Sequence, residues 1–180
     1  MAISASDILF KLSVLTGSAG NSTAQGNVNN SLGKYISTTQ ITDNTLNNLF
    51  DDVSGAENLA SDVEYRCFFV HNSHASLTWT GASIYISSEV SGGASVAIGI
   101  DTTAASAIGS ASAQALEVAD ESTAPTGVSF SSPTTTGTAL SIGDLTAGQC
   151  RAVWVRRTAA NTSAKNNDGV TFTVFGDTAE

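Results

Sequence analysis

Both histidines and one of the two cysteines lie in one short stretch, YRCFFVHNSH, at residues 65–74. Thiolates and imidazoles are the usual zinc ligands, and a thiolate beside an imidazole is also the arrangement of a cysteine nucleophile with its base. The aromatic residues and valine between Cys67 and His71 predict a β-strand. At about 3.3 Å per residue, this strand separates the two side chains by roughly 13 Å, too far to share a metal or a proton.

His71 and His74 can meet across the turn that follows this strand, but two imidazoles do not complete a zinc site. No third ligand is near them in the sequence. Free thiols are expected in a cytoplasm, whereas a disulfide between Cys67 and Cys150 stays open for a product that ends outside the cell. The stretch therefore predicts a buried strand that turns at Asn72–Ser73 into a partner strand.

Carboxylates cluster between residues 51 and 64, at Asp51, Asp52, Glu57, Asp62 and Glu64. Calcium prefers oxygen ligands of this kind, but the spacing matches no EF-hand, and solvated turns and helix starts also attract acids. Serine is abundant, yet the sequence has no G-x-S-x-G elbow and no phosphate-loop lysine. We therefore expect a protein that is not an enzyme and that uses no metal or cofactor.

The chain of 180 residues carries a net charge of −9, and no Lys or Arg occurs between Cys67 and Cys150. An acidic surface repels phosphate backbones, so a nucleic-acid partner is not expected. No segment approaches the roughly 20 apolar residues that cross a bilayer, and the start of the chain lacks the pattern of a signal peptide. These features predict no membrane partner and synthesis in a cytoplasm.

Short stretches rich in β-branched and aromatic residues follow one another from Asp62 onward, separated by Gly, Ser, Asn and Pro. This pattern predicts an all-β fold, an antiparallel β-sandwich of the immunoglobulin-like or jelly-roll-like kind. Turns at Asn72 and Gly148 are expected to join neighbouring strands as hairpins. The main predicted strands are residues 63–70, 76–87, 95–101, 151–157 and 170–176.

The first part of the chain has a different composition, with the polar run TGSAGNSTAQGNVNNSLG after a short apolar stretch. Such a run offers almost nothing to bury. We therefore expect an extended, loop-rich N-terminal arm at residues 1–58 and a sandwich domain at residues 59–180. Within the arm, Ile8, Phe10, Leu49 and Phe50 are the apolar anchors expected to pack against a partner subunit or a sister copy.

A concentration of cations and tryptophan occurs late in the chain, in VWVRRT. Trp and Arg are over-represented at interface hot spots, while charge also protects an edge strand against unwanted pairing. Both interpretations hold if the edge strand is where a neighbouring subunit docks. Trp154, Arg156 and Arg157 therefore join the four apolar anchors as candidate interface residues.

Four segments within residues 45–177 resemble small virion structural proteins of tailed bacteriophages: LFDDVSGAE, DVEYRCFFVHN, ESTAPTGVSFSSP and IGDLTAGQCRAVWVRRT. The most similar role is that of a capsid decoration, or cement, protein. The resemblance implies a non-enzymatic component that forms homotrimers on the outer capsid face and braces neighbouring major capsid proteins. The implied partner is the major capsid protein, and the implied location is the virion exterior after synthesis in the host cytoplasm.

Phage neck, tail and fibre proteins are built on similar sandwiches, so they define the alternative. In that case the chain would be a module that binds another virion protein or a host-surface glycan. Glycan recognition would need exposed aromatic residues, and Trp79 and Tyr85 are the candidates.

Overall fold

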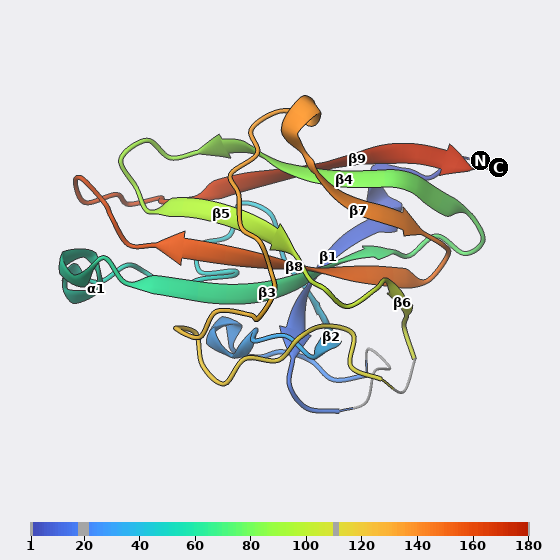
Figure 1. Cartoon of the computed structure of the whole chain (residues 1–180), viewed down its shortest axis with the longest axis horizontal. Coiled ribbons are helices and arrows are strands. Elements are labelled where there is room, and N and C mark those ends of the chain that lie inside the picture. The colour runs from blue at the N-terminus through green and yellow to red at the C-terminus, as the bar shows by residue number, and fades with distance from the viewer. Residues whose placement is uncertain (1, 18–21, 110–111, 180) are drawn as a thin grey trace.

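Two antiparallel β-sheets packed face to face form the body of the protein in the computed structural model, which describes residues 2–17, 22–109 and 112–179 (Figure 1). The strands are β1 (Ile8–Val14), β2 (Tyr35–Gln40), β3 (Val63–Asn72), β4 (Thr78–Glu89), β5 (Ser95–Ile100), β6 (Ser106–Ala107), β7 (Leu140–Leu145), β8 (Gln149–Thr158) and β9 (Val170–Ala179). The larger sheet has the order β2-β1-β3-β8-β5, with β6 beside β8, and the smaller has the order β7-β4-β9. The predicted all-β antiparallel sandwich is confirmed.

Helices are few and short. The α-helix α1 (Gly55–Ala60) begins with a capping box, in which Ser54 Oγ accepts from the Glu57 backbone N–H at 3.2 Å and Glu57 Oε2 accepts from the Ser54 N–H at 2.6 Å. Among the described residues, no helix is long and apolar enough to cross a membrane. The remaining helical turns are 3-10 helices at Ala5–Asp7, Val28–Asn30 and Thr136–Thr138.

The main core lies between the two sheets. Its aromatic centre is Phe68 of β3, whose ring centroid lies 5.5 Å from that of Phe10 in β1 and 5.5 Å from that of Phe172 in β9. These rings join strands that are far apart in the sequence. The other buried apolar residues of this core include Leu12, Val70, Ile84, Ile86, Ile98, Ile142, Leu145, Val153 and Val155.

A second core covers the outer face of the larger sheet. Mostly irregular chain within residues 101–109 and 112–133 runs across this face, as Figure 1 shows in yellow. Cys67, Phe69 and Trp154 are buried beneath it and the 28–34 segment. Because β3 and β8 are covered on both faces, their central residues, 67–70 and 152–155, are apolar without alternation.

Gly33 allows a close approach within this outer layer. Its φ is +95°, and a Cβ at this position would lie 1.9 Å from the Leu116 carbonyl oxygen and 3.0 Å from the Trp154 ring. Only glycine combines this backbone conformation with so little space.

The structure corrects the expected N-terminal arm, because the first 58 residues contribute two strands to the larger sheet. The strand β1 pairs with β3 from Ile8 opposite Asn72 to Leu12 opposite Phe68, and β2 pairs with β1. The apolar runs ILFKLSV and YISTTQ are short and separated by polar sequence, so composition alone does not reveal their distant partners. Residues 18–21 of the intervening polar run lie outside the described residues.

Both expected hairpin corners are wrong, because each connects strands of different sheets. The strand β3 lies in the larger sheet and β4 in the smaller, and the same division separates β7 from β8. Asn72 links the two connections between the sheets, β3 to β4 and β7 to β8. Its side-chain Nδ2 donates to the carbonyl oxygens of Leu77 and Leu145, both at 2.9 Å, and its backbone carbonyl oxygen accepts from the Gly148 N–H. Turn residues indicate where the chain reverses and leave open which sheet it then enters.

Candidate protein-binding groove

The two cysteines are buried free thiols. The register of β3 and β8 places Cys67 opposite Trp154 and His71 opposite Cys150, so the cysteines are four residues apart along the sheet. This separation of about 13 Å excludes the disulfide that the sequence left open, because a disulfide requires Cα atoms within about 7 Å. Burial raises the pKa of the Cys67 thiol, and raises that of Cys150 to about 12. Neither cysteine is therefore an activated nucleophile.

The two histidines have separate structural positions. His71 is buried, and its Nδ1 has no hydrogen-bond partner among the described residues. His74 Nδ1 accepts from the backbone N–H groups of Ser76 at 3.1 Å and Leu77 at 3.0 Å, which orders the connection between β3 and β4. Within the described part of the chain, no group of three or more His, Cys, Asp or Glu side chains could hold a metal ion.

The acids that suggested calcium are distributed among different partners. Glu57 belongs to the capping box of α1, while Glu64 and Asp51 both pair with Arg157. Arg157 Nε donates to Glu64 Oε2 at 2.7 Å, and its Nη1 donates to the Asp51 carbonyl oxygen. The guanidinium carbon lies 4.7 Å from the centroid of the Phe50 ring. Arg157 thus holds the loop that contains residues 50 and 51 against the larger sheet.

The strand that carries Trp154 and the two arginines is central, since β8 lies between β3 and β5. The expectation of an edge strand is therefore wrong. Trp154 is fully buried, and its Nε1 donates to Asp101 Oδ2 at 2.6 Å. Arg156 and Arg157 point to opposite faces, because successive residues of a strand alternate. The Arg156 guanidinium lies 5.5 Å from the Phe130 ring in the outer layer.

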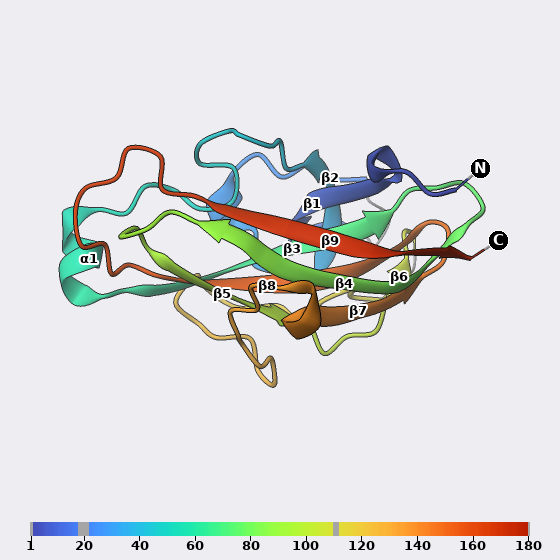
Figure 2. The same cartoon turned by 90° about the horizontal axis from the view of Figure 1, so that it is seen from above.

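An open groove of about 2200 Å³ brings together five of the seven candidate interface residues. It lies on the side of the sandwich where β9 faces β1 and the connection at residues 41–54 (Figure 2). Phe172 and Val174 of β9 line it and are only partly buried, and Leu46 at its margin is 60% exposed. The five are Ile8, Phe10, Leu49, Phe50 and Arg157, whereas Trp154 and Arg156 lie outside the groove.

The charged residues that line this groove are mostly acidic. Five are carboxylates and two are cations, and one of the cations is Arg157, which already pairs with Glu64 and Asp51. The groove therefore combines an apolar lining with a negative margin. The carboxylates are Asp43, Asp51, Asp52, Glu89 and Asp168, and the second cation is Lys165.

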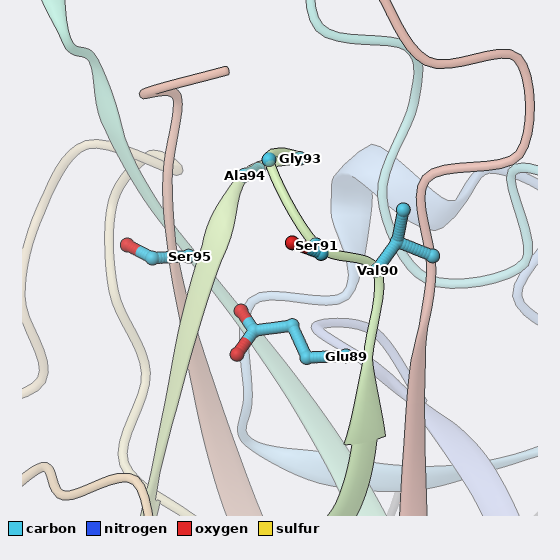
Figure 3. A pocket seen from close by; sticks show the side chains of 7 residues that line it. Glu89, Val90, Ser91, Gly93, Ala94 and Ser95 are labelled. Carbon is cyan, nitrogen blue, oxygen red and sulfur yellow. The ribbon is translucent and has the colours of Figure 1, made fainter. Parts of the chain in front are cut away.

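A smaller hollow of about 230 Å³ lies in the connection between β4 and β5, where Glu89–Ser95 line it (Figure 3). The Glu89 carboxylate, which Figure 3 shows between the two strands, accepts from the Val96 N–H at 2.7 Å. Asp168 Oδ2 accepts from the Ala94 N–H at 2.7 Å. These bonds order the connection itself, and we assign the hollow no ligand.

The two aromatic candidates for a glycan site do not lie on the same surface. Trp79 is 4% exposed and belongs to the main core. Tyr85 lies on the outer face of the smaller sheet, where its ring centroid is 6.2 Å from that of Phe175. One partly exposed aromatic pair therefore remains on that face.

Sequence reasoning missed the contribution of β9 to the groove. In the strand predicted at residues 170–176, Phe172 and Val174 alternate with threonines, which predicts one apolar face but not what that face lines. One sequence feature could have indicated that this strand has an open edge, because residues 170–179 contain no Lys, Arg or Pro. These residue types commonly protect an exposed strand edge from pairing.

Comparisons with known proteins give no relative: no protein-family model, no curated protein and no solved structure matches the chain significantly.

Proposed function

We propose that this protein is a non-enzymatic virion structural protein that decorates a bacteriophage capsid and stabilises it by binding the outer surface of major capsid proteins. The resemblance of residues 45–177 to phage virion proteins supports the class. The observation that carries a protein-binding role is the open groove, whose apolar lining comes from β1, β9 and the 41–54 connection.

Apart from His71, whose Nδ1 has no hydrogen-bond partner among the described residues, the main polar side chains that would suggest chemistry have structural partners. Glu64 and Arg157 form a buried ion pair, and Asp101 accepts from Trp154 and from the Leu116 N–H. Such groups order the fold, while the groove leaves apolar surface exposed. An apolar patch with a polar margin is the usual form of a protein-binding surface.

The proposal includes a homotrimer on the capsid exterior, as in the proteins that this chain resembles. A net charge of −9 suits a position away from packaged DNA. Repeated modest contacts across a symmetric shell would provide stabilisation through multivalency.

The alternative is a tail or fibre module that binds a host-surface glycan, for which the Tyr85–Phe175 pair is the supporting observation. Aromatic faces bind sugars, but the pair lies on the flat outer face of the smaller sheet. Phe175 also lines the groove but Tyr85 does not, so the groove does not present the pair as one surface, and we therefore place this function second.

Particles assembled with and without the protein test the proposal. We expect particles that lack it to release their DNA at a lower temperature, and added purified protein to restore the original temperature. Heat-release curves followed with a DNA-binding dye measure this directly. Equal release temperatures for the two kinds of particle would contradict a stabilising role.

A further inference from the structure

The edges of the larger sheet are covered by the protein's own chain. On β2, the Thr38 N–H donates to the Thr23 carbonyl oxygen at 2.9 Å. On β5, Ile98 and Ser131 exchange two backbone hydrogen bonds, at 2.8 and 3.0 Å. In the smaller sheet, the edge strand β7 is short and lies against β5 and β8.

The strand β9 is different, because it is ten residues long and pairs on one side only, with β4. Among the described residues, no backbone hydrogen bond is made along the other side of its Val170–Gly176 portion. The strand also lacks the Lys, Arg or Pro that would discourage pairing. It therefore presents a free row of backbone donors and acceptors beside the groove.

The free backbone groups of β9 can be assigned from the pairing of β4. The Ile86 N–H donates to the Pro133 carbonyl oxygen, on the side of β4 away from β9. Ile86 and Phe172 are therefore a non-hydrogen-bonded pair in the register of β4 and β9. Because pairs alternate along the strand, Phe172 and Val174 both direct their N–H and C=O groups to the open edge. Their side chains line the groove.

The charged residues that line the groove favour a cationic partner over a second copy of this chain. A second copy of the chain would bring a net charge of −9 to a lining with five carboxylates and two cations. Over distances below the Debye length of about 8 Å, this repulsion disfavours self-pairing. A cationic segment is attracted to the same surface.

We propose that β9 binds an extended segment of a partner protein by strand addition, with alternate apolar side chains of that segment facing Phe172 and Val174 and with Lys or Arg flanking this apolar part at its ends. Main-chain hydrogen bonds would supply affinity, and the groove and its carboxylates would supply specificity. This inference rests on the proposed role of the groove as the contact surface, and it adds the chemistry of the segment that the partner contributes.

An NMR titration of the full chain tests strand addition. The probe, the Lys-Val peptide, is a capped seven-residue peptide with Val at alternate central positions and Lys at both ends. We expect the amide resonances of Phe172 and Val174 to shift and their hydrogen exchange to slow. The same peptide with Glu in place of Lys should bind at least tenfold more weakly, as should one N-methylated at alternate residues, which removes the N–H groups that pair with β9.

Two matched variants isolate the backbone contribution. Val174→Pro removes an N–H that faces the open edge and leaves the hydrogen bonds to β4, whereas Val174→Ala shortens the side chain and keeps that N–H. We expect Val174→Pro to bind the Lys-Val peptide at least tenfold more weakly than Val174→Ala. Equal binding by the two variants would overturn the proposal, as would equal binding of the methylated and unmethylated peptides by the wild-type protein.

The same variants separate this inference from the proposed function. If Val174→Pro and Val174→Ala restore the heat resistance of depleted particles equally, strand addition is wrong and decoration stands. If the wild-type protein restores nothing, the proposed function is itself contradicted. A wild-type protein whose Phe172 and Val174 amides do not respond to the Lys-Val peptide overturns strand addition irrespective of the particle result.

Discussion

Replacing Arg157 with methionine should lower the free energy of unfolding by about 3–5 kcal/mol, because it leaves the buried Glu64 carboxylate without its main counter-charge. Glu64 and Arg157 are 6% and 7% exposed, so water cannot replace the lost partner. Burial already raises the pKa of the Glu64 carboxyl, and the Arg157 hydrogen bond opposes this rise. In the variant we therefore expect the pKa to rise further and the loss of stability to be smaller at acidic pH.

Urea unfolding of two comparison variants shows whether the ion pair is responsible. The double variant Glu64→Leu, Arg157→Met should regain a large part of the lost stability, because an apolar pair leaves no buried charge uncompensated. Arg156→Met makes the same side-chain change one residue earlier, where the guanidinium packs on Phe130, and should cost about 1 kcal/mol or less. An Arg157→Met variant as stable as Arg156→Met would show that the pair contributes little.

Lowering the pH from 7 to 4 should remove about 3 kcal/mol of stability through His71 alone, since one unit of pKa shift corresponds to about 1.4 kcal/mol. Burial lowers the pKa of His71 from 6.5 to about 4, and the nearby charge of Lys11 acts in the same direction. The unfolded chain therefore binds a proton near pH 6.5 that the folded chain does not bind until about pH 4. Stability is complete above pH 6.5 and falls as the pH decreases through this window.

The pH dependence can be assigned to His71 by substitution. In His71→Leu the stability measured between pH 7 and 4 should fall by about 3 kcal/mol less than in the wild-type protein. His74→Asn retains an oxygen that can accept from the Ser76 and Leu77 N–H groups, and should keep the wild-type slope. If His71→Leu and the wild-type protein lose stability equally on acidification, His71 is not the group responsible.

The sequence predicted the fold class because the strands carry their own signals. VEYRCFFV and VTFTVFG favour strands through β-branched and aromatic residues, and both lie in strands of the structure. The sequence did not predict which connections pass from one sheet to the other. The residues around Asn72 and Gly148 indicate that the chain reverses there, but they do not indicate which strand the next strand pairs with. The same limit hid β1 and β2, whose partners are selected by packing across long sequence distances.

The candidate site was predicted in part. The apolar character of Ile8, Phe10, Leu49 and Phe50 marked residues that the fold gathers in one groove with Arg157. Trp154 could not be placed from its type, because tryptophan is common in cores as well as at interfaces. Its burial depends on the layer that supplies Asp101 as the hydrogen-bond acceptor.

Electron microscopy of an intact decorated particle tests the central claim, that the groove beside β9 is the contact surface. We expect density from the capsid protein to enter the groove and run alongside Phe172 and Val174. The outer face of the smaller sheet around Tyr85, which does not line the groove, should face solvent. Bound molecules whose groove is open to solvent, with the contact made by that outer face, would contradict the account.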